Sequence, residues 1–470
     1  MPTDSLIDLL PIEFWIAVAV MVSLAIYAVS QIRHGIGLPL LAVLATVAVW
    51  YIGDVAYNNY ANNHLIKFPP EVLAFAWIQV VVFSATLFAG VLAIQPIANR
   101  DCYQNASRIH FLSQHGSDFL EIQETVSLFG KICWGLWIGL IALAILNVGS
   151  DSFSFALPFT GHPINPFVRG RVASGPLGAV FSLATNFHVL VAAGFGLVAA
   201  LSKNPLIRIA AIVGCFMTWP YFLLNRTRNT MLATCAPGIF AWIFVRVRLS
   251  FSLKIVLLLA ALFIGDTWLR FVMEARNNQT SVAGYFLNSD VQEITSTDTK
   301  HAGLNMYEEL CWLNHLMENG NYTPNGGRRY FAEAVNPVPR ALWSGKPLIG
   351  IEYAIARGQK FDQAGAAQAG VGATISTGMI GQGVDNFGPI FGPIAAGLLM
   401  SFWVVILARI DLHAASTWRL PLYALGLVLT FNCGRDITLL VLYPFVFGLL
   451  IVKFLETQKP NQPEQYAVAR

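Results

Sequence analysis

Charged residues are scarce in this chain. Only 12% of its 470 residues are Asp, Glu, Lys or Arg, whereas 56% are hydrophobic. Soluble domains carry about 25% charged residues, so a water-exposed protein of this composition would present large apolar patches and aggregate. A bilayer removes this difficulty, because its hydrocarbon core solvates apolar side chains and disfavours charged ones. The composition therefore excludes an ordinary soluble enzyme and predicts an all-α polytopic membrane protein.

Basic blocks and paired cysteines are also missing. A net charge of +3 without any Lys/Arg-rich block argues against a nucleic-acid partner. The 6 cysteines form no C-x-x-C pair and most lie in apolar runs, so neither a disulfide framework nor a zinc site is expected. The outer loops contain no H-E-x-x-H or D-x-D pattern, and we predict no metal or other cofactor. Residues 1–11 lack a basic segment and a cleavage site, so the first apolar run is expected to be a retained span.

Apolar runs of about 20 residues, the length that crosses a hydrocarbon core, predict about eleven transmembrane helices. We expect them near residues 12–30, 36–53, 72–94, 128–148, 177–200, 205–224, 229–246, 251–269, 387–408, 418–433 and 436–453. Lys and Arg recur in alternate short loops, as at Arg33, Lys203 and Arg409, and such loops face the cytoplasm. The pattern places the N-terminus outside and the C-terminus inside.

This topology divides the chain into four parts. Residues 1–269 form an N-terminal membrane bundle of spans one to eight, with a cytoplasmic linker at 95–127 that is either an interfacial helix or a plain connection. Residues 270–386 form one long extracytoplasmic loop between spans eight and nine, because they are too polar to span and too long for a simple connection. Residues 387–457 hold spans nine to eleven, and 458–470 form a cytoplasmic tail.

Arginine is more frequent than lysine on the outer side, where basic residues are normally few. The set at the edges of spans and in the long loop includes Arg169, Arg171, Arg226, Arg228, Arg328, Arg329 and Arg435. A guanidinium presents a planar fork that matches phosphate, and it stays charged. For any single arginine, snorkelling to lipid phosphates is an equal alternative. The set as a whole favours an anionic, lipid-linked substrate.

The long loop contains one segment with the pattern of a helix. Gly303–Asn319 has Met306, Leu310, Leu313 and Met317 on one face and is followed by Gly320, a stop signal. The opposite face carries His301, Asn305, Glu308, Trp312 and His315. Such a face could hold a sugar, with Glu308 or His315 as the general base for a hydroxyl. The alternative is an ordinary solvated helix face.

Two further stretches of the loop have distinctive patterns. The prolines of Asn336–Pro347 predict a rigid extended segment that presents Arg340, Trp343 and Lys346. This combination of cations and an indole suits a phosphorylated glycan, although Trp343 could simply pack the segment on the membrane. The stretch Gly370–Gly383 is rich in Gly, Thr and Ser, so its backbone could approach a ligand closely. It does not match a P-loop.

Three stretches together resemble a known family. They are Arg226–Arg228 leading into an apolar span, the Pro-Arg…Trp…Lys-Pro order in Asn336–Pro347, and the Gly/Thr-rich run into Asn386-Phe387-Gly388. With the topology, they resemble the bacterial oligosaccharide repeat-unit polymerases, the Wzy-type O-antigen and exopolysaccharide polymerases. The resemblance covers the C-terminal half of the chain, and the N-terminal half only through hydropathy.

The resemblance implies a metal-independent glycosyltransferase in the bacterial inner membrane with a periplasmic active site. Such enzymes move a growing glycan from undecaprenyl pyrophosphate to a lipid-linked acceptor repeat unit, and a separate co-polymerase usually regulates chain length. On this hypothesis Arg340 and Lys346, with Arg226, Arg228 and Arg435, would bind pyrophosphate. Glu308 or His315 would activate the acceptor, and Trp312 and Trp343 would stack on sugar. An O-antigen ligase and a lipid-linked glycan flippase remain alternatives.

Overall fold

The computed structural model describes about two thirds of the chain. The described residues are 10–32, 35–53, 55, 67–99, 119–149, 166–167, 178–225, 228–247, 250, parts of 253–268, 306–335, 338, 343, 345–347, 350–358, 375–410, 419–435 and 439–457. All regular secondary structure within these ranges is helical. The predicted helical fold class is confirmed to this extent.

Among the residues that the structure describes, five helices are long and apolar enough to cross a bilayer. They comprise Ile12–Ser30, Pro70–Ile94, Val126–Val148, Pro205–Leu224 and Gly378–Ala408. Shorter apolar helices occupy Gly37–Ile52, Phe187–Leu201 and Phe445–Phe454. Their number and composition indicate a multi-pass helical membrane protein.

Helices occur at each of the predicted apolar runs. They are α1 (Ile12–Ser30), α2 (Gly37–Val47) continued by η1 (Ala48–Ile52), α4 (Pro70–Asn99), α6 (Phe119–Val148), α8 (Gly178–Leu201), α9 (Pro205–Asn225), α10 (Arg228–Ala241) continued by η6 (Trp242–Arg246), α17 (Gly378–Ala408), α18 (Arg419–Cys433) and α19 (Leu439–Thr457). The described residues between 253 and 268 are helical too. Because α4 ends at Asn99 and α6 begins at Phe119, both ends of the predicted 95–127 linker are helical.

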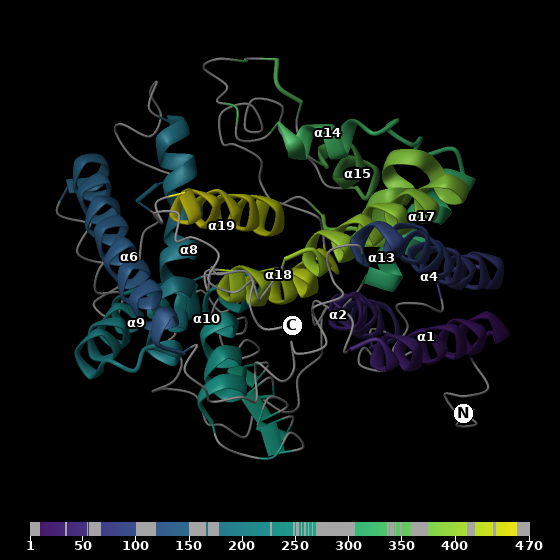
Figure 1. Ribbon diagram of the computed structural model, residues 1–470. Helices are drawn as coiled ribbons and strands as arrows, with labels where there is room; N and C mark the ends of the chain where they lie inside the picture. The colour runs from purple at the N-terminus through teal and green to yellow at the C-terminus, as the bar shows by residue number, and fades with distance from the viewer. Residues whose placement is uncertain are drawn as a thin grey trace, which may run out of the picture.

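The helices form two groups joined by the C-terminal pair (Figure 1). One group contains α6, α8, α9 and α10, and the other contains α1, α2, α4 and α17. Helix α18 packs against α2 in one group and α10 in the other, and α19 packs against α8. The C-terminal helices therefore tie together segments that lie far apart in the sequence.

The described part of the predicted long loop contains three short helices: α13 (Met306–Glu318), α14 (Arg328–Ala334) and α15 (Ile351–Ala356). Helix α13 is inserted beside α4. Tyr307 donates to the carbonyl oxygen of Leu73 at 2.8 Å and stacks on Trp77 with 4.1 Å between ring centroids. Further along, the amides of Asn314 and Gln79 exchange hydrogen bonds of 2.8 and 2.9 Å. From Leu73 to Gln79, α13 therefore follows α4 for about 9 Å.

Helix α17 starts earlier than the span predicted at 387–408 because it consists of two halves. Gly388, between them, has φ +81° and ψ 176°, a conformation almost restricted to glycine. A Cβ on Gly383 would lie 2.2 Å from the carbonyl oxygen of Gly392, whereas residues nine apart in a straight helix are separated by about 13 Å. The first half therefore folds back on the second. Pro389 begins the second half, where a helix does not need its N–H.

This fold-back changes the interpretation of the Gly-rich stretch at 370–383. Its first residues lie outside the described part of the chain. From Gly378 onward it is helical, and a Cβ on Gly378 would clash with the Tyr51 hydroxyl. The glycines of this described part bring helices close to one another, rather than exposing backbone to a ligand.

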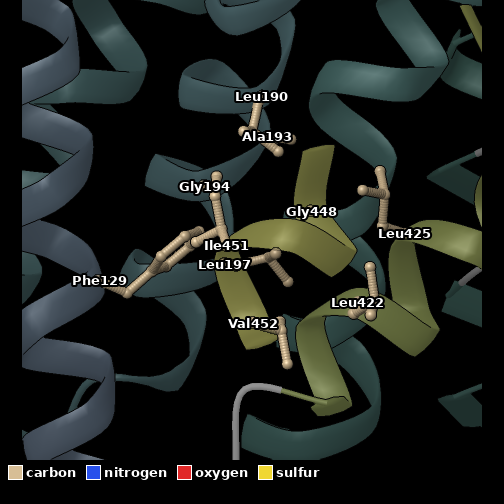
Figure 2. A pocket seen from close by; sticks show the side chains of 10 residues that line it. All are labelled: Phe129, Leu190, Ala193, Gly194, Leu197, Leu422, Leu425, Gly448, Ile451 and Val452. Atoms are coloured by element: carbon tan, nitrogen blue, oxygen red, sulfur yellow. The ribbon is translucent and has the colours of Figure 1, made fainter. Parts of the chain in front are cut away.

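A small cavity lies between α6, α8, α18 and α19 (Figure 2). Its volume is about 40 Å³, and its ten lining residues, which include Phe129, Leu197 and Leu422, are all apolar or glycine. A water molecule in this volume would find no side-chain hydrogen-bonding partner. The cavity is a gap in the packing of four helices and offers no functional site.

Candidate functional site

Arg329 lies at the centre of a buried polar network that joins α14 to the first half of α17. Its side chain is only 2% exposed, and its Nη1 lies 2.8 Å from Asp385 Oδ2. The same nitrogen donates to Thr377 Oγ1 at 3.1 Å, and Nε lies 3.5 Å from a carboxylate oxygen of Glu333. We call these four residues, with Tyr322, Asn325 and Gln382, the Arg329 network.

The Asp385 carboxylate accepts hydrogen bonds from three residues of this network. Tyr322 Oη and Asn325 Nδ2 donate to Asp385 Oδ1 at 2.5 and 3.0 Å, in addition to the Arg329 contact at Oδ2. Burial, together with the Asp385 carboxylate, raises the pKa of Tyr322 well above its ordinary value, so the phenol remains a donor. Gln382 Nε2 donates to Glu333 Oε1 at 2.8 Å. Arg329, predicted to contact substrate, is enclosed in the structure by protein groups that it holds in place.

A second group of charged residues surrounds Trp312 and extends to the surface. Lys67 Nζ lies 2.7 Å from Glu308 Oε1, and Trp312 Nε1 donates to the same oxygen at 3.4 Å. Lys67 Nζ also lies 4.7 Å from the centroid of the Trp312 ring, and Arg357 Cζ lies 4.2 Å from it. We call Lys67, Glu308, Glu309, Trp312, Tyr353 and Arg357 the α13 cluster. Its carboxylates and cations come from three separate segments of the chain, namely the residues before α4, helix α13 and the end of α15.

The inner side of the α13 cluster is built on Glu309. Arg357 donates to the Glu309 carboxylate through Nε at 3.2 Å and Nη2 at 2.9 Å, a two-point contact. Tyr353 Oη donates to Glu309 Oε2 at 2.5 Å. Burial and the adjacent Glu309 raise the pKa of Tyr353 well above its ordinary value. These contacts fix α15 against α13.

The two predicted general bases occupy different environments on α13. Glu308 is 4% exposed, so the solvated helix face considered as an alternative is wrong for this residue. Its environment is closed because Lys67, which precedes α4, covers it. His315 is half-buried, and Asn319 Nδ2 lies 3.1 Å from its ring Nε2. The two residues are about 10 Å apart along the helix axis, so they would not act on one hydroxyl together.

Other predicted substrate contacts lie at the edge of these groups. Arg328 forms an ion pair of 2.9 Å with Glu352, and both side chains are exposed. Arg435 is half-buried; its Nε donates to Ser376 Oγ at 2.8 Å, and its carbonyl oxygen accepts from Gly378 N–H. Arg328 and Arg435 thus stand close to the first half of α17 without being enclosed as Arg329 is.

The proline-rich segment is described at only a few residues. Lys346 is nearly buried and its Nζ donates to the carbonyl oxygen of Val338 at 3.0 Å, so it closes the segment on itself. Trp343 is 37% exposed and lies edge-on to Phe331, with 6.1 Å between ring centroids. The described residues of this segment are non-helical, as the prolines predict.

Several predicted site residues belong to parts of the chain other than those described. Arg169, Arg171, Arg226 and Arg340 lie outside the described residues, as do His301 and Asn305. Arg228 is the first residue of α10, and its side chain lies outside the description. Among the residues the structure does describe, no group of three or more His, Cys, Asp or Glu is arranged to hold a metal ion.

Sequence reasoning missed most of the acidic partners. Asp385 carried a usable signal, since a lone carboxylate in an apolar run is expected to have a buried partner. Glu309, Tyr353 and Arg357 carried none, because only the fold brings α15 to α13. Comparisons with family models, with curated proteins and with solved structures found no match for this chain.

Proposed function

We propose that this protein polymerises lipid-linked oligosaccharide repeat units in a bacterial inner membrane. The growing glycan would pass from undecaprenyl pyrophosphate to the sugar of a lipid-linked acceptor, on the periplasmic side, without a metal ion. The proposed topology has eleven spans with the N-terminus outside and the C-terminus inside. The sequence resemblance and the geometry of the α13 cluster both support this function.

The observation that carries the proposal is the mixed charge of the α13 cluster at one end of the bundle. Its outer cation, Lys67, is 37% exposed at the side chain, and Arg357 is 17% exposed. Both cations lie beside buried carboxylates and an indole, groups suited to a phosphorylated sugar. Arg328 and Arg435 add positive charge nearby, where a second pyrophosphate could bind.

The proposed reaction assigns one step to each kind of group. Glu308 would take the proton of the acceptor hydroxyl, whose oxygen then bonds to the anomeric carbon of the donor sugar. The bond between that carbon and the pyrophosphate oxygen breaks, and undecaprenyl pyrophosphate leaves with its electron pair. Lys67 and Arg357 would stabilise the charge that develops on the leaving group. Lys67 must move from Glu308 toward the phosphate for Glu308 to become a base.

The ends of the helices support a single active side. Lys67 precedes α4 and Arg435 follows α18, and each contacts a residue of the predicted long loop. Thus the start of α4, the start of α17 and the end of α18 lie at the same end as α13, α14 and α15. This is the arrangement expected if the spans alternate and the long loop faces the periplasm.

The test measures the length of the glycan made in cells whose only copy of this protein carries Glu308→Gln or Arg357→Gln. We expect single repeats on the carrier, with membrane protein levels equal to those of the wild type. Arg409→Gln, at the opposite end of α17, is the matched control and should give full-length polymer. Long polymer in cells with Glu308→Gln would contradict the assignment. If cells without any copy of the protein accumulate long polymer on its lipid carrier, the protein is a ligase.

A second candidate, transport of a lipid-linked glycan, is favoured by one observation. The break in α17 at Gly388 lies close to the buried Arg329–Asp385 ion pair, and broken helices with buried charges are common at transporter binding sites. Purified protein in liposomes distinguishes the two. Polymerase activity requires new glycosidic bonds between lipid-linked repeats, whereas transport alone moves the intact glycolipid between leaflets.

A further inference from the structure

A large apolar groove runs along α9, between α9 and α10, in the group of helices formed by α6, α8, α9 and α10, whereas α13 packs against the other group. Its volume is about 910 Å³, within the range of about 300–1,000 Å³ found for ligand pockets. One wall is a single face of α9 that runs from Arg208 through Phe216 to Leu224, about 24 Å at 1.5 Å per residue. The opposite wall comes from α10 and η6, and small residues of α8 form the floor.

The floor exists because α8 and α10 meet closely. A Cβ on Gly238 would lie 2.7 Å from Cα of Gly196, so only glycines permit this approach. Trp219 is fixed against α8, because its Nε1 donates to the carbonyl oxygen of Ala192 at 2.9 Å. At the far end, Trp268 Nε1 donates to the carbonyl oxygen of Leu223 at 3.2 Å. The groove is therefore shaped by fixed groups.

Both basic residues of the groove stand at one end. Arg208 lies in the first turn of α9 and Arg246 is the last residue of η6, and α9 and α10 are antiparallel neighbours. Arg246 is held there by a 3.1 Å hydrogen bond from Nη1 to the carbonyl oxygen of Ser202, just after α8. Within the part of the chain that the structure describes, no carboxylate pairs with either arginine. This end carries two positive charges whose counter-charge the described residues do not supply.

The open side of the groove indicates that a molecule bound there is surrounded by lipid. Phe216 is 69% exposed and Trp242 is 50% exposed, and α9 is one of the helices apolar and long enough to span a bilayer. In a membrane this side faces lipid. A ligand that enters from there must have a long apolar part, and the two arginines select one whose head is an anion.

We propose that the groove between α9 and α10 binds one anionic glycerophospholipid of the surrounding bilayer. Its phosphate contacts Arg208 and Arg246, and an acyl chain lies along α9 over the small residues of α8. The bound lipid fills space that the helices leave open and holds α9 against η6. The positive end is on the side that the loop charges predict to be cytoplasmic, so the site is separate from the glycan site proposed above and does not depend on it.

The test uses the full-length protein, purified in detergent and depleted of lipid, with phosphatidylglycerol and phosphatidylcholine of identical acyl chains as probes. Native mass spectrometry should show one retained phosphatidylglycerol, and its apparent affinity should fall about tenfold or more in Arg208→Gln/Arg246→Gln, since charge-assisted hydrogen bonds are lost. Arg409→Gln removes an arginine from the same membrane side without touching the groove and should bind as the wild type does.

A second variant examines the apolar part. Ala199→Phe places a ring on the floor of the groove and should reduce binding of both lipids, provided that the purified variant remains monodisperse. Equal retention of the two lipids by the wild type, or unchanged phosphatidylglycerol binding in the double arginine variant, would overturn the proposal. So would binding of undecaprenyl phosphate in place of phosphatidylglycerol, because the occupant would then be a different lipid.

Discussion

The buried ion pair between Arg329 and Asp385 makes the strongest energetic prediction. Asp385→Ala removes the carboxylate and leaves the Arg329 guanidinium buried at 2% side-chain exposure. Breaking such a pair costs about 3–5 kcal/mol when the partner charge remains buried. Glu333 still lies 3.5 Å from Arg329 Nε and compensates part of this charge, so we expect a value near the lower limit, about 3 kcal/mol.

The assay is reversible unfolding of the purified protein in mixed micelles, followed by circular dichroism as the fraction of denaturing detergent rises. Asp385→Asn should lie between the wild type and Asp385→Ala, because an amide keeps an acceptor for Tyr322 but not the charge. Replacing both partners, as in Arg329→Met/Asp385→Leu, should recover part of the loss, since no uncompensated charge is then buried.

The matched control is the Arg328–Glu352 pair, which also starts from α14 but joins it to α15 and is exposed. Its side chains are 62% and 54% accessible, and exposed pairs contribute about 0–1 kcal/mol. Glu352→Ala should therefore change the unfolding free energy by less than about 1 kcal/mol. If Asp385→Ala is no more destabilising than Glu352→Ala, the Arg329 network does not hold the loop, and the reasoning fails.

Three further predictions concern stability. Gly388→Ala should destabilise the protein by about 1–3 kcal/mol in the same assay, because φ +81° with ψ 176° is strained for alanine, whereas Gly139→Ala, where a Cβ meets open space, should not. Gln79→Leu leaves the Asn314 amide without its partner and should cost about 1–3 kcal/mol, and Gln79→Leu/Asn314→Leu should cost less than the sum of the single changes. The pKa of Tyr353 is raised in the folded state, so its protonated phenol contributes to the free energy of unfolding. This contribution is fully present below the unfolded pKa of 10.0 and is lost as the pH rises above it, because the unfolded phenol ionises first. Unfolding titrations from pH 8 to 11 should show this loss of stability, with a smaller slope in Tyr353→Phe.

The sequence predicted helix positions well because membrane spans depend on local composition. Every predicted apolar run contains helix in the described residues, and α1 begins and ends where the run at 12–30 does. The start of α17 was missed for a tertiary reason. Its first half is too short to span by itself, and only the turn at Gly388 and the close contact of Gly383 with Gly392 reveal two halves.

The candidate site was predicted in its residue types but not in its pairings. The pattern over 303–319 predicted a helix, which is confirmed as α13. It also predicted that Glu308 and Trp312 share one face, and the two side chains are in contact. It could not show that Lys67, from the loop before α4, covers Glu308. Nor could it show that Arg357 and Glu309 meet, since these contacts join residues 241 and 48 positions apart.

The ion pairs of Arg329, Arg328 and Lys67 differ in the free energy needed to separate them, and this difference decides which cations an anionic substrate could contact. An anion that binds Arg329 must first separate a buried ion pair, at a cost of about 3–5 kcal/mol. An anion that binds Arg328 displaces an exposed partner worth about 1 kcal/mol at most, and Lys67 is intermediate because its side chain is exposed while Glu308 is buried. The arginine excess on the side predicted to be outside therefore has two physical causes. Part of it neutralises buried carboxylates that hold α13, α14 and α15 to the bundle, and only the exposed remainder is open to a phosphate.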